Sequence, residues 1–354
     1  MRAVRMEKRG PAKEALVFHA NHRLPQRQPN QVLLAAAATS VAAGDWKMRS
    51  GFAPIPLKLP KILGEDVSGV VLEAPTGSKF KRGDRVFGCT GQVLKSGEPF
   101  GTNAEFVAAE ESVLALIPAG VSFQEAASVP VSGLTAWQAL APAMPLAGKR
   151  VLVHGGAGGV GSFAIQAGWA IAKAQGAHVT TTCSGRNVEF VTRQLGADVA
   201  IDYTQAPWEA SPGATAAPFD HIVDTIGGSY ERASLRLLSK GGSFANLGAS
   251  GPGVDKVSVW GIVGMLLGAM WRSMLGAVRL GPPYKFVMQD CTASKGLDQI
   301  AALMAEGKVK VHLDKVFTLE ELAAAHEYAE QGHVRGKVAV TICDDPAARW
   351  LAAS

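Results

Sequence analysis

Five glycines crowd residues 155–161, inside the stretch VLVHGGAGGVGSFAIQ, and this pattern points most directly to chemistry. Gly156, Gly158 and Gly161 fit the spacing G-x-G-x-x-G, with a strand-type run before them and a helix-type run after them. The first glycine allows a sharp turn, the second lets the main chain approach a pyrophosphate, and the third lets the helix pack closely on the strand. The start of the helix adds unpaired N–H groups for phosphates. The pattern therefore predicts a dinucleotide-binding site.

Two alternatives use the same glycines. A triphosphate-binding loop needs Lys and then Ser or Thr after the last glycine, but Ser162 and Phe163 follow Gly161, which excludes it. The other alternative is a tight strand-to-helix turn that binds nothing, and the residues alone leave it open.

The end of the second strand distinguishes the two nicotinamide cofactors. A site for NAD usually places Asp or Glu there, whereas residues 180–187 read TTTCSGRN and contain no acid. Ser184 and Arg186 instead offer a hydroxyl and a guanidinium that could hold a 2′-phosphate, so NADPH is favoured over NADH. Arg186 could also be an exposed residue at a helix start. Tyr203, at the end of the third strand, is the next candidate for the adenosine end.

The elements that must position these residues change character along the chain. Residues 1–130 hold short β-type runs separated by Gly and Pro, which predicts an antiparallel, partly barrel-like domain. Residues 131–285 alternate strand and helix signals, which predicts a doubly wound parallel sheet. Residues 286–354 return to mixed character, and we expect them to complete the β-rich domain. The fold class is α/β.

Composition limits the class of protein. The chain has 354 residues, 47% hydrophobic and 18% charged, which is enough for two globular domains. The net charge is +5, but Lys and Arg are scattered and not interleaved with aromatics, so we expect no nucleic-acid partner. The four cysteines lie far apart and fit a reducing compartment, which could be cytoplasm, mitochondrion or chloroplast. No secretory signal is visible, and a transit peptide could have been removed already.

The longest uncharged apolar run is VSVWGIVGMLLGAMW, residues 257–271, shorter than the roughly 20 residues that span a bilayer. Its three glycines weaken it as an independent membrane anchor, so a buried or subunit-facing helix is favoured over membrane-surface contact. A peripheral membrane contact or an assembly contact through this run stays open.

Motifs along nearly the whole chain resemble one family. They are ILGEDVSGVV, FKRGDRVFG, AEFV, VSGLTAWQAL, VLVHGGAGGVG, LGADVAIDYT, DTIGG and GHVRGKVAV. Together they resemble the medium-chain dehydrogenase/reductase superfamily, in its zinc-independent, quinone oxidoreductase-like branch. Residues 257–288 look most similar to the mitochondrial reticulon-interacting NADPH oxidoreductases and their plant and algal relatives. The resemblance implies a GroES-like catalytic domain and a Rossmann domain, NADPH as hydride donor, and a quinone or activated alkene as acceptor. We also expect a homodimer.

Zinc-dependent members of this superfamily hold their catalytic metal with residues that this chain lacks. The family histidine of GHE is Glu65 here, the usual cysteine is Ala42, and the second cysteine falls near Val131. We therefore expect no catalytic zinc. The neighbouring acids Glu65 and Asp66 are interpreted as structural, with a general acid as the weaker alternative.

The candidate catalytic residues come from the resemblance. Relatives carry NPxDxxxRSG where residues 42–51 read AAGDWKMRSG, so Ala42 and Ala43 replace a polar Asn and a Pro. Lys47 is then the best candidate to stabilise or protonate an oxyanion, with a solvated surface lysine as the alternative. The resemblance also places the hydroxyl of Thr135, within GLTAW, near the nicotinamide.

The resemblance also assigns cofactor contacts by position. The pyrophosphate is assigned to the backbone of four residues: Ala157, Gly158, Gly159 and Val160. Leu247 and Phe286 are placed on the nicotinamide side, and His333 and Arg335 of GHVRGK form a final lid over the cofactor.

The leading hypothesis is an NADPH-dependent reductase of quinones or α,β-unsaturated carbonyls. One rival is a 2-enoyl thioester reductase. The other is a non-catalytic NADPH-binding scaffold or assembly subunit, in which the Ala42 and Ala43 pocket is too depleted for turnover and residues 257–271 form the contact surface.

Overall fold

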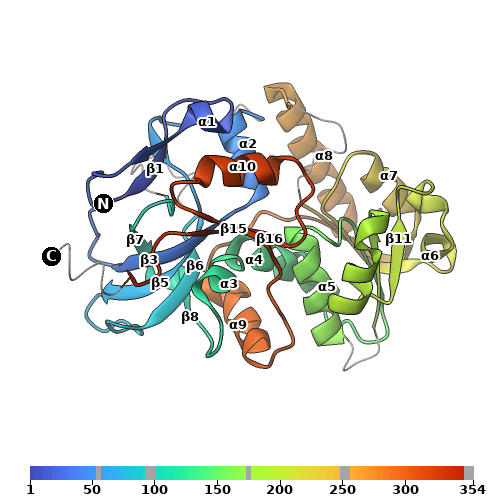
Figure 1. Ribbon diagram of the computed structural model, residues 1–354. Coiled ribbons are helices and arrows are strands. Elements are labelled where there is room, and N and C mark those ends of the chain that lie inside the picture. The colour runs from blue at the N-terminus through green and yellow to red at the C-terminus, as the bar shows by residue number, and fades with distance from the viewer. Residues whose placement is uncertain (53–56, 92–100, 173–176, 248–255, 347–354) are drawn as a thin grey trace. The chain divides into compact units, whose positions relative to one another are not determined.

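The computed structural model describes residues 1–52, 57–91, 101–172, 177–247 and 256–346 (Figure 1). The chain divides into two compact units. The β-rich unit comprises Met1–Leu134, Asp290–Ala305 and Val311–Ser354, and the α/β unit comprises Thr135–Gln289 and Glu306–Lys310.

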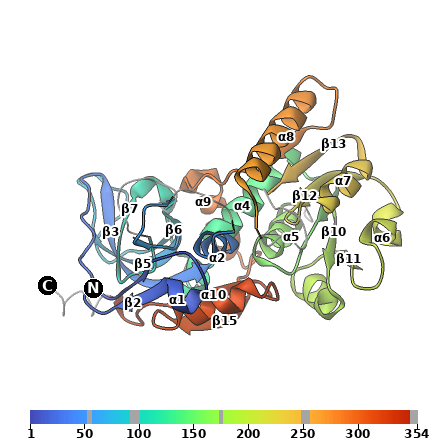
Figure 2. The same ribbon diagram turned by 90° about the horizontal axis from the view of Figure 1, so that it is seen from above.

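A fully parallel sheet forms the centre of the α/β unit (Figure 2). Within the described residues its strands are β9 (Arg150–Val153), β10 (His178–Cys183), β11 (Val199–Asp202), β12 (Phe219–Asp224), β13 (Leu238–Asn246) and β14 (Tyr284–Phe286). They lie in the order β11-β10-β9-β12-β13-β14. Counted from β9, this is the order 3-2-1-4-5-6 of the Rossmann fold, with its switch point between β9 and β12.

Helices cover the strands of this sheet. Among the described residues, the α-helices wholly within the unit are α5 (Gly159–Ala172), α6 (Pro212–Thr215), α7 (Ser229–Arg236) and α8 (Val259–Ala277). Helix α5 packs on β9 and β10, α7 packs on β12 and β13, and α8 packs on β14. Strand β9 is covered on both sides, which explains why Val151, Leu152 and Val153 are all apolar and fully buried.

One helix of this unit differs from the sequence-based expectation. The sequence predicts a helix over 188–195, but a 3₁₀ turn at Gly185–Asn187 precedes a π-helical turn at Phe190–Gln194. The Leu195 N–H donates to the Phe190 carbonyl, five residues back. The hydroxyl of Thr192 donates to the Val188 carbonyl at 2.8 Å, and such side-chain bonds compete with regular helix bonds.

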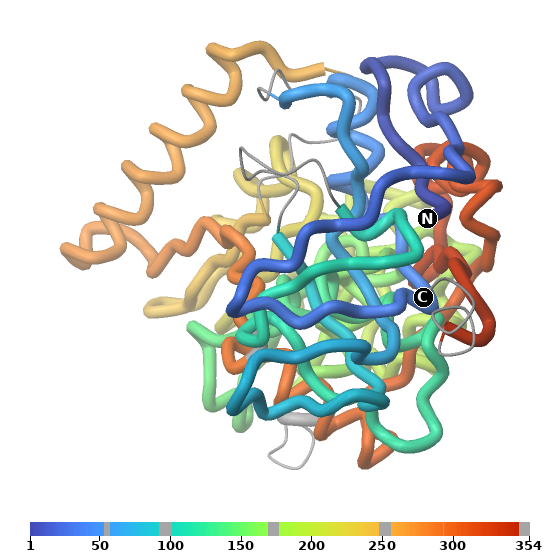
Figure 3. The backbone as a smooth tube through the Cα atoms, turned by 90° about the vertical axis from the view of Figure 1, so that its left-hand side faces the viewer, coloured from blue at the N-terminus to red at the C-terminus, as the bar shows by residue number. Residues whose placement is uncertain are grey.

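The β-rich unit is built on a mostly antiparallel sheet of order β15-β16-β3-β5-β6-β8, with β7 also paired to β3. Its strands are β3 (Gln31–Val41), β5 (Asp66–Glu73), β6 (Arg85–Cys89), β7 (Phe106–Glu110), β8 (Leu114–Leu116), β15 (Leu313–Thr318) and β16 (Lys337–Thr341). A smaller sheet joins β1 (Ala3–Met6), β2 (Leu16–His19) and β4 (Lys61–Ile62). Figure 3 shows the blue and teal strands of this unit side by side.

Segments far apart in sequence complete the β-rich unit. Strand β16 pairs antiparallel with β3, so that Ala339 lies opposite Ser40. The remaining helices are α1 (Ala12–Ala15), α2 (Ala43–Ser50), α3 (Phe123–Ala127), α4 (Pro130–Leu140), α9 (Leu297–Ala305) and α10 (Leu322–Glu330). Helix α10 packs on α1 and α2, and its Leu322 shares one apolar core with Leu34 of β3. Helix α4 crosses from one unit to the other after Leu134.

Candidate functional site

The glycine loop follows β9 at the switch point of the sheet. Gly155 has φ of 66°, a left-handed conformation that glycine adopts without cost. The sequence predicted that Gly156 makes the sharp turn, but the turn falls one residue earlier. Gly156 is needed for a different reason, because a Cβ there would lie 2.0 Å from Thr181 Oγ1 and 2.7 Å from a methyl of Ile165.

The other two motif glycines differ in what surrounds them. A Cβ on Gly161 would lie 2.2 Å from the Gly155 carbonyl oxygen, so close helix–strand packing excludes any side chain. A Cβ on Gly158 would find that same oxygen at 3.4 Å, which is close to ordinary contact. The protein's own packing therefore leaves room beside Gly158. A group outside the chain, such as a pyrophosphate lying against the backbone, would use that room.

Helix α5 begins at Gly159, directly after this room. Its first turn contains no acidic residue, so no side chain there neutralises the partial positive charge of the helix start. The first N–H groups of any helix have no partner within the helix and can bind an anion. The backbone from Ala157 to Val160 fits the pyrophosphate of a dinucleotide.

Buried hydrogen bonds hold the ends of β9 and β12 together at the switch point. The hydroxyl of Thr225 donates to the His154 carbonyl at 2.8 Å. The His154 ring is buried, with Nε2 2.8 Å from Ser234 Oγ and Nδ1 3.2 Å from Thr182 Oγ1. Burial lowers the pKa of His154 to about 3, so the ring is neutral. These bonds fix the backbone from which the glycine loop starts.

The predicted adenosine end of the site lies after β10. Ser184 is half-buried and precedes the 3₁₀ turn, where its hydroxyl accepts a bond from Asn187 Nδ2 at 3.1 Å. Arg186 and Tyr203 are exposed. The Tyr203 N–H donates to the Cys183 carbonyl at 3.1 Å, which brings the end of β11 next to the end of β10.

Sequence reasoning missed an acid at this end. Asp202, the last residue of β11, is in register with Cys183, and its carboxylate would lie 2.5 Å from a Cβ on Gly185. The carboxylate accepts bonds from the N–H and hydroxyl of Thr204 at 2.9 and 2.6 Å, which lower its pKa. Strand pairing between β10 and β11 was the signal that could have found it.

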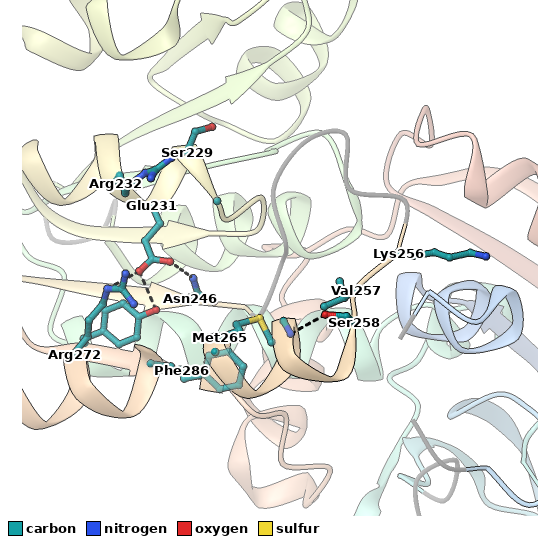
Figure 4. A pocket seen from close by; sticks show the side chains of 15 residues that line it. Ser229, Glu231, Arg232, Asn246, Lys256, Val257, Ser258, Met265, Arg272 and Phe286 are labelled. Carbon is teal, nitrogen blue, oxygen red and sulfur yellow. Dashed lines mark hydrogen bonds and ion pairs between the residues drawn. The ribbon is translucent and has the colours of Figure 1, made fainter. Parts of the chain in front are cut away.

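A pocket of about 610 Å³ lies at the carboxyl ends of β13 and β14, between α7 and α8 (Figure 4). Phe286 and Met265 line it together with Asn246. Glu231 forms one wall and accepts a bond from Asn246 Nδ2 at 3.1 Å; its carboxylate also lies 3.0 Å from Arg272 Nε. Ligands of open parallel sheets bind outside the carboxyl ends of the strands, where this pocket lies.

Asp224 lies at the end of β12 and is fully buried. One carboxylate oxygen accepts from the N–H groups of Ile226 and Gly227, both at 2.8 Å, while the other has no partner among the described residues. Burial raises the pKa of Asp224 to about 6. The half-buried Leu247 donates its N–H to the Asp224 carbonyl at 3.1 Å, so the predicted nicotinamide contact is tied to this strand end.

Lys47 lies on α2 in the β-rich unit and is half-buried. Its ammonium is 5.6 Å from the ring centre of Trp46 and 4.9 Å from that of Phe52. Burial lowers the pKa of Lys47 below its ordinary value. Lys47 is thus not a fully solvated lysine, and within the part of the chain that the structure describes no salt bridge holds it.

The acid pair after β4 divides into two environments. Asp66 is buried and accepts bonds from Ser40 Oγ at 2.5 Å and the Val131 N–H at 2.7 Å, with Lys337 Nζ at 3.6 Å. These bonds support the structural interpretation of Asp66. Glu65 is half-buried, and burial together with Asp45 and Asp66 raises its pKa to about 8. Glu65 therefore holds a proton at neutral pH.

The predicted residues lie on both units. The α/β unit carries the glycine loop, Ser184, Arg186, Tyr203, Leu247, Phe286 and the half-buried Thr135. The β-rich unit carries Lys47 and the exposed His333 and Arg335. Among the described residues, no three His, Cys, Asp or Glu side chains are arranged to hold a metal ion, and the absence of zinc stays a prediction.

A Rossmann sheet with a dinucleotide-type glycine loop, in a chain that returns to a β-rich unit after the α/β unit, defines a nicotinamide-dependent oxidoreductase. Comparison with known proteins agrees. The alcohol dehydrogenase GroES-like domain family matches residues 28–138, and the zinc-binding dehydrogenase family matches residues 195–340.

Individual relatives narrow the class. The "NAD(P)H oxidoreductase RTN4IP1, mitochondrial" of Danio rerio is 35% identical, covering 94% of this chain and 89% of the relative. The 2-methylene-furan-3-one reductase of Solanum lycopersicum is 32% identical, over 92% of this chain and 76% of the relative. The solved structure of the quinone oxidoreductase from Coxiella burnetii superposes with a TM-score of 0.79 at 30% identity, covering 97% of this chain and 99% of that one. The chain belongs to the medium-chain dehydrogenase/reductase family. The resemblance read from its motifs and the predicted fold class are confirmed.

Proposed function

We propose that this protein is an NADPH-dependent reductase that transfers a hydride to a quinone or an α,β-unsaturated carbonyl. The observation that carries the proposal is the room beside Gly158, at the switch point of a Rossmann sheet and the start of a long helix. The named activities of the relatives, an NAD(P)H oxidoreductase, a quinone oxidoreductase and a furanone reductase, agree in reaction type. When bound, NADPH supplies the hydride.

Each part of the α/β unit has a binding role in this proposal. The backbone of Ala157, Gly158, Gly159 and Val160 holds the pyrophosphate. Ser184 and Arg186 hold the 2′-phosphate, with Tyr203 beside the adenine. Asp202 lies close to this end. Its carboxylate already accepts two hydrogen bonds from Thr204, and these use part of its hydrogen-bonding capacity.

The nicotinamide end is assigned to Leu247, Phe286 and Thr135. Support comes from Phe286, which lines the pocket at the carboxyl ends of the strands. His333 and Arg335 are proposed to close over the bound cofactor, and both residues are exposed.

Lys47 is the proposed group that stabilises, and then protonates, the oxygen on which negative charge develops. A lysine whose pKa is lowered by burial is a better proton donor near neutral pH than a solvated one. The aromatic rings of Trp46 and Phe52 restrict where its ammonium can lie. This supports a positioned cation at a place where Ala42 and Ala43 offer no polar group.

The proposed assembly is a homodimer in a reducing compartment, either the cytoplasm or an organelle. Light scattering of the purified protein would test the assembly, and a monomeric mass at micromolar concentration would contradict it.

The activity is tested with purified protein, by NADPH titration and by loss of nicotinamide absorbance with a benzoquinone, an enone and an enoyl-CoA. Saturable NADPH binding with quinone or enone turnover supports the proposal. Preference for the enoyl-CoA would replace it with a 2-enoyl thioester reductase. Binding without turnover of any acceptor would indicate a non-catalytic NADPH-binding scaffold, and absence of NADPH binding would overturn the cofactor assignment.

A further inference from the structure

Helix α8 presents an apolar face to solvent. Over its most apolar stretch only 6% of residues are buried, although the helix is 19 residues long and apolar enough by length and composition to cross a membrane. The sequence favoured a buried or subunit-facing helix, and within its own chain the helix is not buried. The exposed large side chains are Val259, Trp260, Val263, Leu266, Leu267, Met270, Trp271 and Met274, followed by Val278 and Leu280 just after the helix.

The helical residues of this set form one continuous face. Their spacings of one, three and four residues place them within a single stripe of a helix with 3.6 residues per turn, and no polar residue interrupts the stripe. A surface helix of a soluble protein normally has the opposite arrangement, with polar residues toward solvent. We call this stripe the α8 apolar face.

The other side of α8 is held by its own unit. Ala269 is buried, Ser273 Oγ donates to the Tyr284 carbonyl at 3.2 Å, and Arg272 pairs with Glu231 at 3.0 Å. Figure 4 shows Arg272 and Met265 reaching from α8 toward the pocket. A helix fixed in this way cannot cross a bilayer, because one side stays in contact with the sheet. It can only lie along a surface.

Basic residues outnumber acids around the helix. Residues 255–290 contain Lys256, Arg272, Arg279 and Lys285 against Asp255 and Asp290, and Arg272 is paired with Glu231. Lys256 precedes the helix and Arg279 follows it, so both ends of the α8 apolar face are flanked by cations. Trp260 and Trp271 are 82% and 59% exposed, and tryptophan prefers the boundary between lipid and water.

We infer that the α8 apolar face docks this protein on an anionic lipid surface. The apolar stripe enters the boundary between headgroups and acyl chains, while the flanking cations contact the anionic headgroups. Pairing of two copies through this face would bring the flanking cations Lys256 and Arg279 of both helices together, whereas anionic headgroups would neutralise them. The inference does not depend on the proposed reductase activity.

The test is co-sedimentation of the full chain with vesicles of phosphatidylcholine and phosphatidylglycerol in equal amounts. We expect binding that weakens with added salt and falls at least tenfold on pure phosphatidylcholine. The double variant Trp260→Ser/Leu267→Ser should lose at least tenfold in vesicle affinity. The control is Leu116→Ser, which removes a similarly exposed apolar side chain from β8 and should bind as the parent does.

A charge variant provides the second measurement. Arg279 has φ of 60°, which asparagine tolerates, so Arg279→Asn removes the cation with little strain. We expect it to weaken binding to the mixed vesicles and not to neutral ones. Circular dichroism and NADPH binding check that each variant folds. The inference is overturned if the parent does not bind the mixed vesicles, if the double variant binds them equally well, or if the double variant changes a dimer into a monomer and leaves vesicle binding unchanged.

Discussion

The glycine loop and the α2 segment are the two parts of the molecule to which chemistry is assigned, and they are constrained differently. In the glycine loop, backbone packing dictates residue types: Gly156 and Gly161 would clash with the protein itself if they carried a Cβ. On α2, nothing in the backbone requires Lys47, whose role depends on burial and neighbouring rings. A steric requirement can be read from sequence, whereas a chemical one needs the surroundings of the side chain.

The largest expected effect tests the α2 side of this comparison. Lys47→Met should lower kcat by roughly 10²- to 10⁴-fold, as expected for loss of a general acid, without changing the dissociation constant of NADPH. Activity of the parent should fall as pH rises through the lowered pKa of Lys47, because the protonated form is the donor. Stopped-flow and steady-state kinetics across pH provide the measurement.

Lys47→Arg is the matched control, because it keeps the charge but raises the pKa. The Lys47→Arg variant should retain part of kcat, and the alkaline limb of its pH–activity profile should shift to higher pH. A Lys47→Met variant with unchanged kcat and an unchanged pH profile would remove Lys47 from the reaction.

A pair of glycine variants tests the loop side. Gly161→Ala should destabilise the fold by about 1–3 kcal/mol, because its Cβ overlaps the Gly155 carbonyl. Gly158→Ala should leave the unfolding temperature nearly unchanged. It should raise the dissociation constant of NADPH at least tenfold, which corresponds to about 1.4 kcal/mol of binding free energy. Thermal unfolding and NADPH titration separate the two effects. Equal loss of stability in both variants would mean that the room beside Gly158 serves the chain and not a ligand.

The choice of cofactor can be tested at Arg186. Arg186→Ala should raise the dissociation constant of NADPH by about 10- to 150-fold and leave that of NADH nearly unchanged, since a charged hydrogen bond to phosphate contributes about 1.5–3 kcal/mol. Tyr203→Phe, which keeps the ring, serves as control. If the dissociation constants of NADPH and NADH rose equally, Arg186 would not bind the 2′-phosphate.

The smallest effect concerns Glu65, which belongs to the same unit as Lys47. Glu65 has a folded-state pKa of about 8, well above its ordinary value, so the folded protein holds a proton that the unfolded chain releases. The free energy of unfolding should therefore decrease as pH rises from about 4.5 to 8. Glu65→Gln should remove part of this dependence and be more stable than the parent at pH above 8 by roughly 1 kcal/mol, since Glu65 is partly exposed. Denaturant unfolding at several pH values measures the free energy of unfolding of both proteins. If this free energy varied with pH in parallel for parent and variant, the prediction would be contradicted.

Much of the fold could be predicted because it depends on local patterns. Alternating strand and helix signals indicated a parallel sheet, and the glycine spacing indicated where its switch point lies. The position of Asp202 beside Gly185 depends on the register between β10 and β11, which no single segment contains. The turn at Phe190–Gln194 depends on a hydroxyl competing for one carbonyl.

The exposure of α8 is a third feature that the sequence did not predict, and the reason is different. An apolar run indicates that a helix avoids water, but it does not say whether protein or lipid covers it. The glycines of this run do not explain the exposure, because a Cβ on Gly264 would meet nothing within 4 Å and one on Gly268 would meet only the Arg272 side chain. Only the packed structure shows which side is covered.

The pairing of β16 with β3 has a consequence for how the protein is made. Ser40 lies opposite Ala339, so strands from the beginning and the end of the chain share one ladder. During synthesis the α/β unit emerges complete while the β-rich sheet still lacks β15 and β16, and domains generally fold as they emerge. The ribosome must therefore release the chain through Thr341 before β3 meets this partner. Until then the side of β3 that binds β16 is an open edge, on which a chaperone or a second nascent chain could bind.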